Sequence, residues 1–79
     1  MPSLSITLGA KIRAMRNRKG FSQDGLALQC GLDRSYMGRI ERGEVNITVD
    51  KLYQISDLLG CEPADLLPRI NEVDRSTRN

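Results

Sequence analysis

Residues 22–43, SQDGLALQCGLDRSYMGRIERG, predict two short helices joined by a tight turn. Ser22 begins the first helix, because a serine hydroxyl accepts a hydrogen bond from the free amides of a first helical turn. Gly31 ends that helix, since glycine adopts the left-handed conformation without a side-chain clash. We expect Asp33 to cap the second helix, which Gly43 ends.

The second of these helices has two chemically different sides. Met37 and Ile40, three residues apart, form its apolar side. The opposite side is polar and basic, and it carries Arg34, Ser35, Gly38, Arg39 and Arg42. A helix of about ten residues is not stable alone in water, so its apolar side must pack against other helices. The basic side is then available to a polyanion, which is the arrangement of a helix-turn-helix DNA-binding unit.

Apolar residues at helical spacing predict three further helices. The first is expected at roughly residues 6–19, with Ser5 or Thr7 as its cap. The fourth is capped by Thr48, and a short fifth helix has Pro63 at its first position, where proline is tolerated. Five helices and no convincing strand predict an all-α fold, a compact bundle.

Length and composition limit the kind of protein. The 79 residues make one domain, expected over residues 1–73, and residues 74–79 lack apolar side chains and are expected to be a disordered tail. No run approaches the ~20 apolar residues needed to span a bilayer. No leader peptide is recognisable at the start. We therefore expect no association with a membrane, and a cytoplasmic location.

The residue types that catalysis and metal binding require are scarce. The sequence has no histidine, and Cys30 and Cys61 lie far apart without a CxxC spacing, so a metal site is not expected. We expect both cysteines to be buried free thiols, the alternative being a redox sensor. The usual general base is missing, as is a glycine-rich phosphate loop. We expect no enzymatic activity, no cofactor and no small-molecule ligand.

The net charge of +2 conceals an uneven distribution. Residues 1–43 contain eight basic and three acidic residues, whereas residues 44–79 contain four and seven. A basic first half and an acidic second half suit a protein that turns one face toward nucleic acid. The alternative is chance scatter of charge over a solvated surface.

Residues 8–67 resemble the large helix-turn-helix family of phage Cro and C1-type repressors, also called XRE-like. The matching residues are Leu8-Gly9, Ile12-Arg13, Arg16, Lys19-Gly20, Ser22-Gln23, Leu26-Ala27, Gly31-Leu32, Ile40-Glu41-Arg42-Gly43, Leu52, Ile55, Leu59-Gly60 and Asp65-Leu66-Leu67. Within them, Asp33-Arg34-Ser35-Tyr36 with Ile40-Glu41-Arg42 and Asn46 is similar to the controller proteins of restriction–modification systems. The resemblance implies a lambda-repressor-like bundle and a regulator of transcription that binds double-stranded DNA.

Candidate DNA contacts follow from the exposed face and from this resemblance. Base contacts in the major groove are expected from Asp33, Arg34, Ser35, Tyr36, Gly38 and Arg39. Phosphate contacts are expected from Gln23, Arg42, Asn46 and Thr48. Tyr36 has an alternative place in the core, and Thr48 an alternative role as a helix cap. The resemblance also implies a structural ion pair between Arg16 and Glu41; the alternative is a solvated arginine.

Specific recognition predicts a homodimer, because one small domain contacts few base pairs and two on a symmetric operator roughly double the recognition energy. The candidate interface residues are Tyr53, Leu58 and Ile70, which the apolar pattern does not assign to the core. Ordinary partial burial is the alternative for them. For function, the alternatives are an antitoxin or another protein-interaction module of the same fold, and a helical bundle whose charge is incidental.

Overall fold

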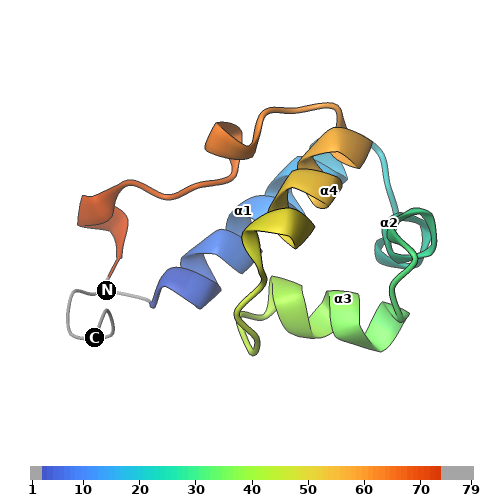
Figure 1. Ribbon diagram of the computed structural model, residues 1–79, viewed down its shortest axis with the longest axis horizontal. Helices are drawn as coiled ribbons and strands as arrows, with labels where there is room; N and C mark the ends of the chain where they lie inside the picture. Colours follow the sequence, from blue (N-terminus) through green and yellow to red (C-terminus); the bar gives the residue numbers. More distant parts are fainter. Residues whose placement is uncertain (1–2, 74–79) are drawn as a thin grey trace.

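The computed structural model describes residues 3–73 and contains four α-helices followed by two short 3-10 turns (Figure 1). The elements are α1 (Leu4–Arg18), α2 (Gln23–Cys30), α3 (Arg34–Glu41), α4 (Val49–Leu59), η1 (Pro63–Asp65) and η2 (Ile70–Glu72). Within residues 3–73 there is no strand. The predicted all-α fold is confirmed.

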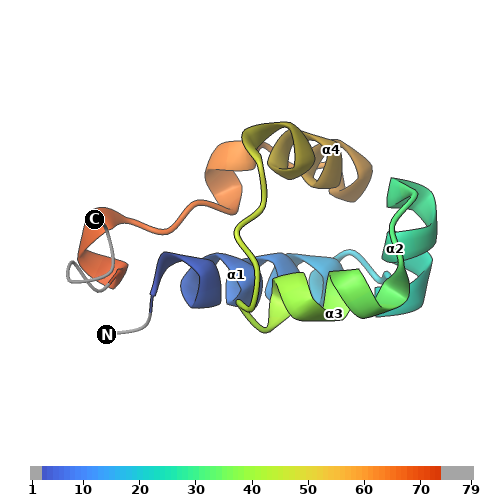
Figure 2. The ribbon, with the colours of Figure 1, turned by 60° about the horizontal axis from the view of Figure 1, so that its bottom comes forward.

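The helices enclose one core to which each of the four α-helices, and the residue directly after η1, contributes a fully buried side chain. These are Ile12, Leu26, Met37 and Ile55 from α1 to α4, and Leu66 after η1, all 0% exposed. Figure 2 shows α1 and α3 running alongside each other, with α2 closing one end of the pair. Because Met37 and Ile40 point into this core, the polar side of α3 faces outward.

The predicted cap of the first helix is wrong, and the predicted short fifth helix, which begins at Pro63 as expected, is of the 3-10 type. The first helix begins at Leu4, and its cap is Ser3, whose hydroxyl accepts a hydrogen bond from the Ile6 amide at 3.3 Å. The predicted caps, Ser5 and Thr7, lie inside the helix instead. The fifth helix is only the 3-10 turn η1, because Pro68 has no amide hydrogen and disfavours a helical conformation in the residue before it.

Two glycines allow α1 to lie close to the end of α3. A Cβ atom at Gly9 would lie 2.7 Å from the carbonyl oxygen of Glu41 and closer still to that of Ile40. Gly43 has φ +75°, and a Cβ atom there would lie 2.6 Å from Cγ1 of Ile6. Both contacts are shorter than real Cβ atoms make, so the close approach requires glycine at both positions.

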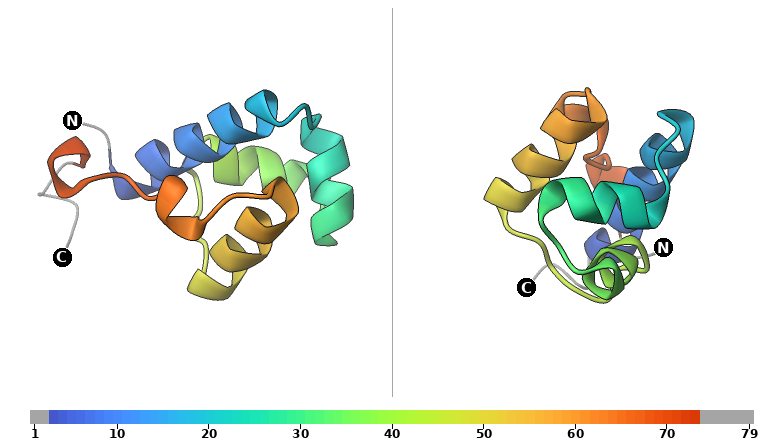
Figure 3. Two further views of the ribbon diagram at one scale, coloured as in Figure 1. Left: turned by 90° about the horizontal axis from the view of Figure 1, so that it is seen from above. Right: turned by 90° about the vertical axis from the view of Figure 1, so that its right-hand side faces the viewer.

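The chain after α4 returns along α1 (Figure 3). An ion pair between Lys11 Nζ and Glu72 Oε2, at 3.3 Å, links η2 to α1, and Val73 is buried. The described part of the domain therefore packs as far as residue 73, while the predicted tail, residues 74–79, lies outside the described residues. Among residues 3–73, no helix combines the length and apolar character that crossing a bilayer requires.

The two cysteines differ in exposure. Cys30 is buried, as predicted, whereas Cys61 is only half-buried beside the core. Burial raises the pKa of both thiols, and at Cys61 the carboxylate of Asp65 adds to the rise. Both thiols are therefore poor nucleophiles at neutral pH, which does not favour the alternative of a redox sensor. The described residues contain no group of three or more side chains able to hold a metal ion.

Candidate nucleic-acid interface

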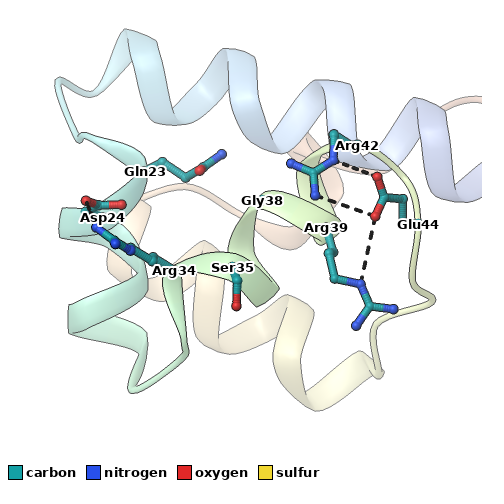
Figure 4. A pocket seen from close by; sticks show the side chains of 8 residues that line it. All are labelled: Gln23, Asp24, Arg34, Ser35, Gly38, Arg39, Arg42 and Glu44. Atoms are coloured by element: carbon teal, nitrogen blue, oxygen red, sulfur yellow. Dashed lines mark hydrogen bonds and ion pairs between the residues drawn. The ribbon is translucent and has the colours of Figure 1, made fainter.

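Residues at the helix ends fix where α2 ends and α3 begins, and so how tight the turn between them is. The Ser22 hydroxyl accepts from the Gly25 amide at 2.9 Å at the start of α2, and Gly31, in the left-handed conformation, ends it. Asp33 occupies the cap position of α3 with extended backbone, but its carboxylate makes no capping hydrogen bond, so that part of the prediction is wrong. The tight turn brings the first turn of α2 beside the exposed side of α3 (Figure 4).

An open hollow lies between these helices, and we call it the α2–α3 hollow. Its lining residues are Gln23, Asp24, Arg34, Ser35, Gly38, Arg39, Arg42 and Glu44. Figure 4 shows that most of these side chains come from one face of α3 and the loop after it. Three arginines on so small a surface make it a candidate for binding a polyanion.

The structure brings most of the candidate base-contacting residues to this hollow. Arg34, Ser35 and Arg39 are exposed along it. Gly38 is buried and forms its floor, where a Cβ atom would lie 3.0 Å from Nη1 of Arg42. Asp33 is exposed but lies outside the lining, and half-buried Tyr36 packs against the core.

The candidate phosphate-contacting residues separate into two pairs. Gln23 and Arg42 line the hollow. Asn46 lies in the loop before α4, where its side-chain oxygen accepts a hydrogen bond from the Ser5 hydroxyl. Thr48 caps α4, its hydroxyl accepting from the Lys51 amide at 3.1 Å. The structure therefore gives Asn46 and Thr48 partners of their own outside the hollow.

A buried ion pair joins α1 to the end of α3. Arg16 Nε lies 2.6 Å from Glu41 Oε2, and Arg16 Nη2 lies 3.0 Å from Glu41 Oε1. The two side chains are 9% and 2% exposed. Gln23 Nε2 donates a third hydrogen bond to Glu41 Oε1 at 3.0 Å, and Arg16 also donates to the Phe21 carbonyl. This network ties α1, α2 and α3 together and holds the exposed face of α3 at one angle.

The hollow also contains two carboxylates, Asp24 and Glu44, which the sequence analysis did not include in the DNA-binding face. Asp24 Oδ2 lies 3.5 Å from Arg34 Nη1. Glu44 Oε2 lies 2.6 Å from Arg42 Nε, and Glu44 Oε1 lies 3.8 Å from Arg39 Nε. Glu44 follows Arg42 by two residues and Arg39 by five, and helical side chains do not meet at either spacing, so no local signal in the sequence indicated these contacts.

The candidate dimer residues do not share one environment. Tyr53 on α4 and Ile70 in η2 are 59% and 62% exposed. Leu58 is half-buried and packs against the core, so only part of its side chain is available for a dimer contact. Val49 and Leu67 are further exposed apolar side chains, which the prediction did not include.

Two short helices at a fixed angle, with arginines on the outer face of the second, define a helix-turn-helix DNA-binding protein. The helix-turn-helix family model matches residues 12–66 of the chain. The chain is 39% identical over 66 residues to the control protein C.BamHI of Bacillus amyloliquefaciens, covering 82% of each protein. The chain therefore belongs to the helix-turn-helix family, of the Cro/C1 or XRE type.

Solved structures agree with this membership. The restriction–modification controller protein C.AhdI from Aeromonas hydrophila is 39% identical, with a TM-score of 0.75 over 78% of this chain and 94% of that one. The biofilm regulator SinR, solved in complex with DNA, is 32% identical, with a TM-score of 0.70 over 75% of this chain and 95% of that one. The protein is a DNA-binding regulator of transcription.

Proposed function

We propose that this protein regulates restriction–modification genes by binding a symmetric operator as a homodimer, with α3 in the major groove. The observation that carries the proposal is the α2–α3 hollow, whose three arginines stand on α3 and directly after it. A buried ion pair holds this helix in place. Its similarity to C.BamHI and C.AhdI supports the class of target gene. As a regulator of such genes it would act in the cytoplasm, where bacterial DNA lies.

Base contacts would come from both ends and the middle of the exposed face of α3. Arg34 lies at the start of the helix and Arg39 near its end. Each guanidinium has the geometry to donate two hydrogen bonds to O6 and N7 of a guanine. Ser35, between them, can donate or accept. Gly38, which has no side chain, leaves room for the side chains of Arg42 and Gln23 over the middle of α3, so it would shape the contact surface and not crowd it. Asp33, at the cap position of α3, and Tyr36, in its first turn, would flank this set.

Phosphate contacts would come from the start of α2 and the end of α3. Gln23 Nε2 carries two hydrogens, of which one is donated to Glu41. The second can be donated to a phosphate oxygen, so Glu41 orients Gln23 as well as Arg16. The free amides of the first turn of α2 add to this contact. Arg42 would supply a further one, with Asn46 and Thr48 farther along the loop.

The dimer would bury exposed apolar surface on α4 and near η2. Tyr53 and Ile70 expose more than half of their surface, and Leu58 exposes a smaller part. Pairing two copies buries these side chains and presents two α3 helices, so an operator with two half-sites is bound by both. Dimerisation also adds stability to a domain with a small core.

Selection of bound sequences from random duplex DNA tests the proposal. The wild-type protein should enrich an inverted repeat, and the variant R34A/R39A should enrich none. The matched control is Arg18→Ala, which removes a positive charge from an exposed residue of α1 outside the hollow. This control should enrich the same repeat as the wild type. Enrichment of that repeat by R34A/R39A would refute the assignment of base reading to α3.

A further inference from the structure

Glu44 stands in the loop directly after α3, between two arginines of the hollow (Figure 4). Its carboxylate accepts a hydrogen bond from Arg42 Nε at 2.6 Å and faces Arg39 Nε at 3.8 Å. The hydrogen bond from Arg42 lowers the pKa of Glu44, so the carboxylate is ionised at neutral pH. One negative charge is thus shared by two positive charges on the proposed DNA-binding face.

The pairing leaves the two arginines with different free donors. Arg42 turns both Nε and Nη2 toward Glu44, at 2.6 and 3.5 Å. Arg39 faces Glu44 only through Nε, which leaves its two terminal nitrogens available. Those terminal nitrogens are enough to bond O6 and N7 of a guanine. Arg39 can therefore contact a base in the major groove without leaving Glu44.

Glu44 affects contacts to DNA phosphates differently from the contact of Arg39 to a base. Binding to DNA of arbitrary sequence derives almost entirely from neutralising phosphates and releasing counterions, so it depends on positive charge. Glu44 offsets part of the charge of Arg39 and Arg42, and its carboxylate repels the DNA backbone. The side chains of all three residues are about half exposed, so water and salt weaken this effect but do not remove it.

We propose that Glu44 is a specificity-determining residue: it orients Arg39 toward base edges and lowers the affinity for DNA of arbitrary sequence. The inference rests on the proposed function, in which α3 enters the major groove. It differs from a base contact, because Glu44 acts through the arginines and not on the DNA bases.

The test is Glu44→Gln, which removes the charge and keeps the size of the side chain. The matched control is Glu62→Gln, the same change at an exposed residue after α4, outside both the hollow and the proposed dimer residues. Binding of each protein to the selected operator and to a random duplex of equal length is measured at several salt concentrations. Melting curves first establish that both variants are folded.

We expect E44Q to bind the random duplex about two- to five-fold more tightly than the wild type at low salt, the range that removing one nearby exposed charge gives. Operator affinity should change by less than about two-fold, so the ratio of the two affinities falls. On the random duplex, the salt dependence of E44Q should steepen by about one unit of slope, as for one more neutralised phosphate. E62Q should change both affinities alike.

Two results would overturn the inference. If E44Q behaves like E62Q on both DNAs, Glu44 contributes only net charge. If E44Q leaves binding to the random duplex unchanged, Glu44 does not mask the arginines, whatever happens to operator affinity. A wild-type protein that selects no sequence would instead contradict the proposed function, and the comparison of salt slopes on random DNA would still test whether Glu44 masks the arginines.

Discussion

Arg16→Ala is predicted to lower the free energy of unfolding by about 2–4 kcal/mol. Removing one partner of a buried ion pair typically costs about 3–5 kcal/mol, because the other charge stays buried without compensation. Glu41, with a side chain only 2% exposed, would be that charge. The hydrogen bond from Gln23 to Glu41 would remain and offset part of the loss, so the expected range lies below the typical one.

The assay is urea unfolding followed by circular dichroism for four proteins: the wild type, R16A, E41A and the double variant. The double variant should lose at least about 1 kcal/mol less than the sum of the two single losses, because residues in direct contact are energetically coupled. Arg18→Ala, an exposed arginine on the same helix, is the control, and it should change stability by less than about 0.5 kcal/mol. Additive losses in the cycle would refute the coupling and with it the proposed fixing of α3.

Three further predictions concern packing, DNA recognition and assembly. Gly9→Ala should lower the free energy of unfolding by about 1–3 kcal/mol although alanine favours helices, because its methyl group would overlap carbonyl oxygens at the end of α3; an unchanged melting temperature would contradict this. Arg34→Ala should weaken binding to the operator by about 1–3 kcal/mol and reduce the base preference at one position per half-site. Gln23→Ala should weaken binding to the operator and to random DNA equally. Equal weakening by both variants in a titration would make Arg34 a backbone contact. Sedimentation at about 100 μM, well above the Kd expected of a functional dimer, should show a homodimer that Tyr53→Asp and Ile70→Asp shift toward monomer; a wild-type monomer would refute dimerisation.

The positions of the helices could be predicted from the amino-acid sequence wherever the signal was local. Ser22, Gly31 and Gly43 act within a few residues of their own position, so their cap and end roles could be predicted without knowledge of the fold. The outward face of α3 followed in the same way, because burial of Met37 and Ile40 at helical spacing leaves Arg34 and its neighbours outside. Where several hydroxyls competed, as at the start of α1, the local signal was insufficient.

Contacts between side chains of different elements could not be predicted in this way, because they depend on how the helices pack. The bond from Gln23 to Glu41 joins residues 18 positions apart, and no periodicity predicts it. Glu44 lies in a loop, where helical spacing gives no direction, so its contact with Arg39 required the folded chain. Tyr36 and Leu58 were ambiguous in sequence because an amphipathic or apolar side chain at the edge of a helix suits both the core and the surface, and the packing of neighbouring helices decides how much of it stays exposed.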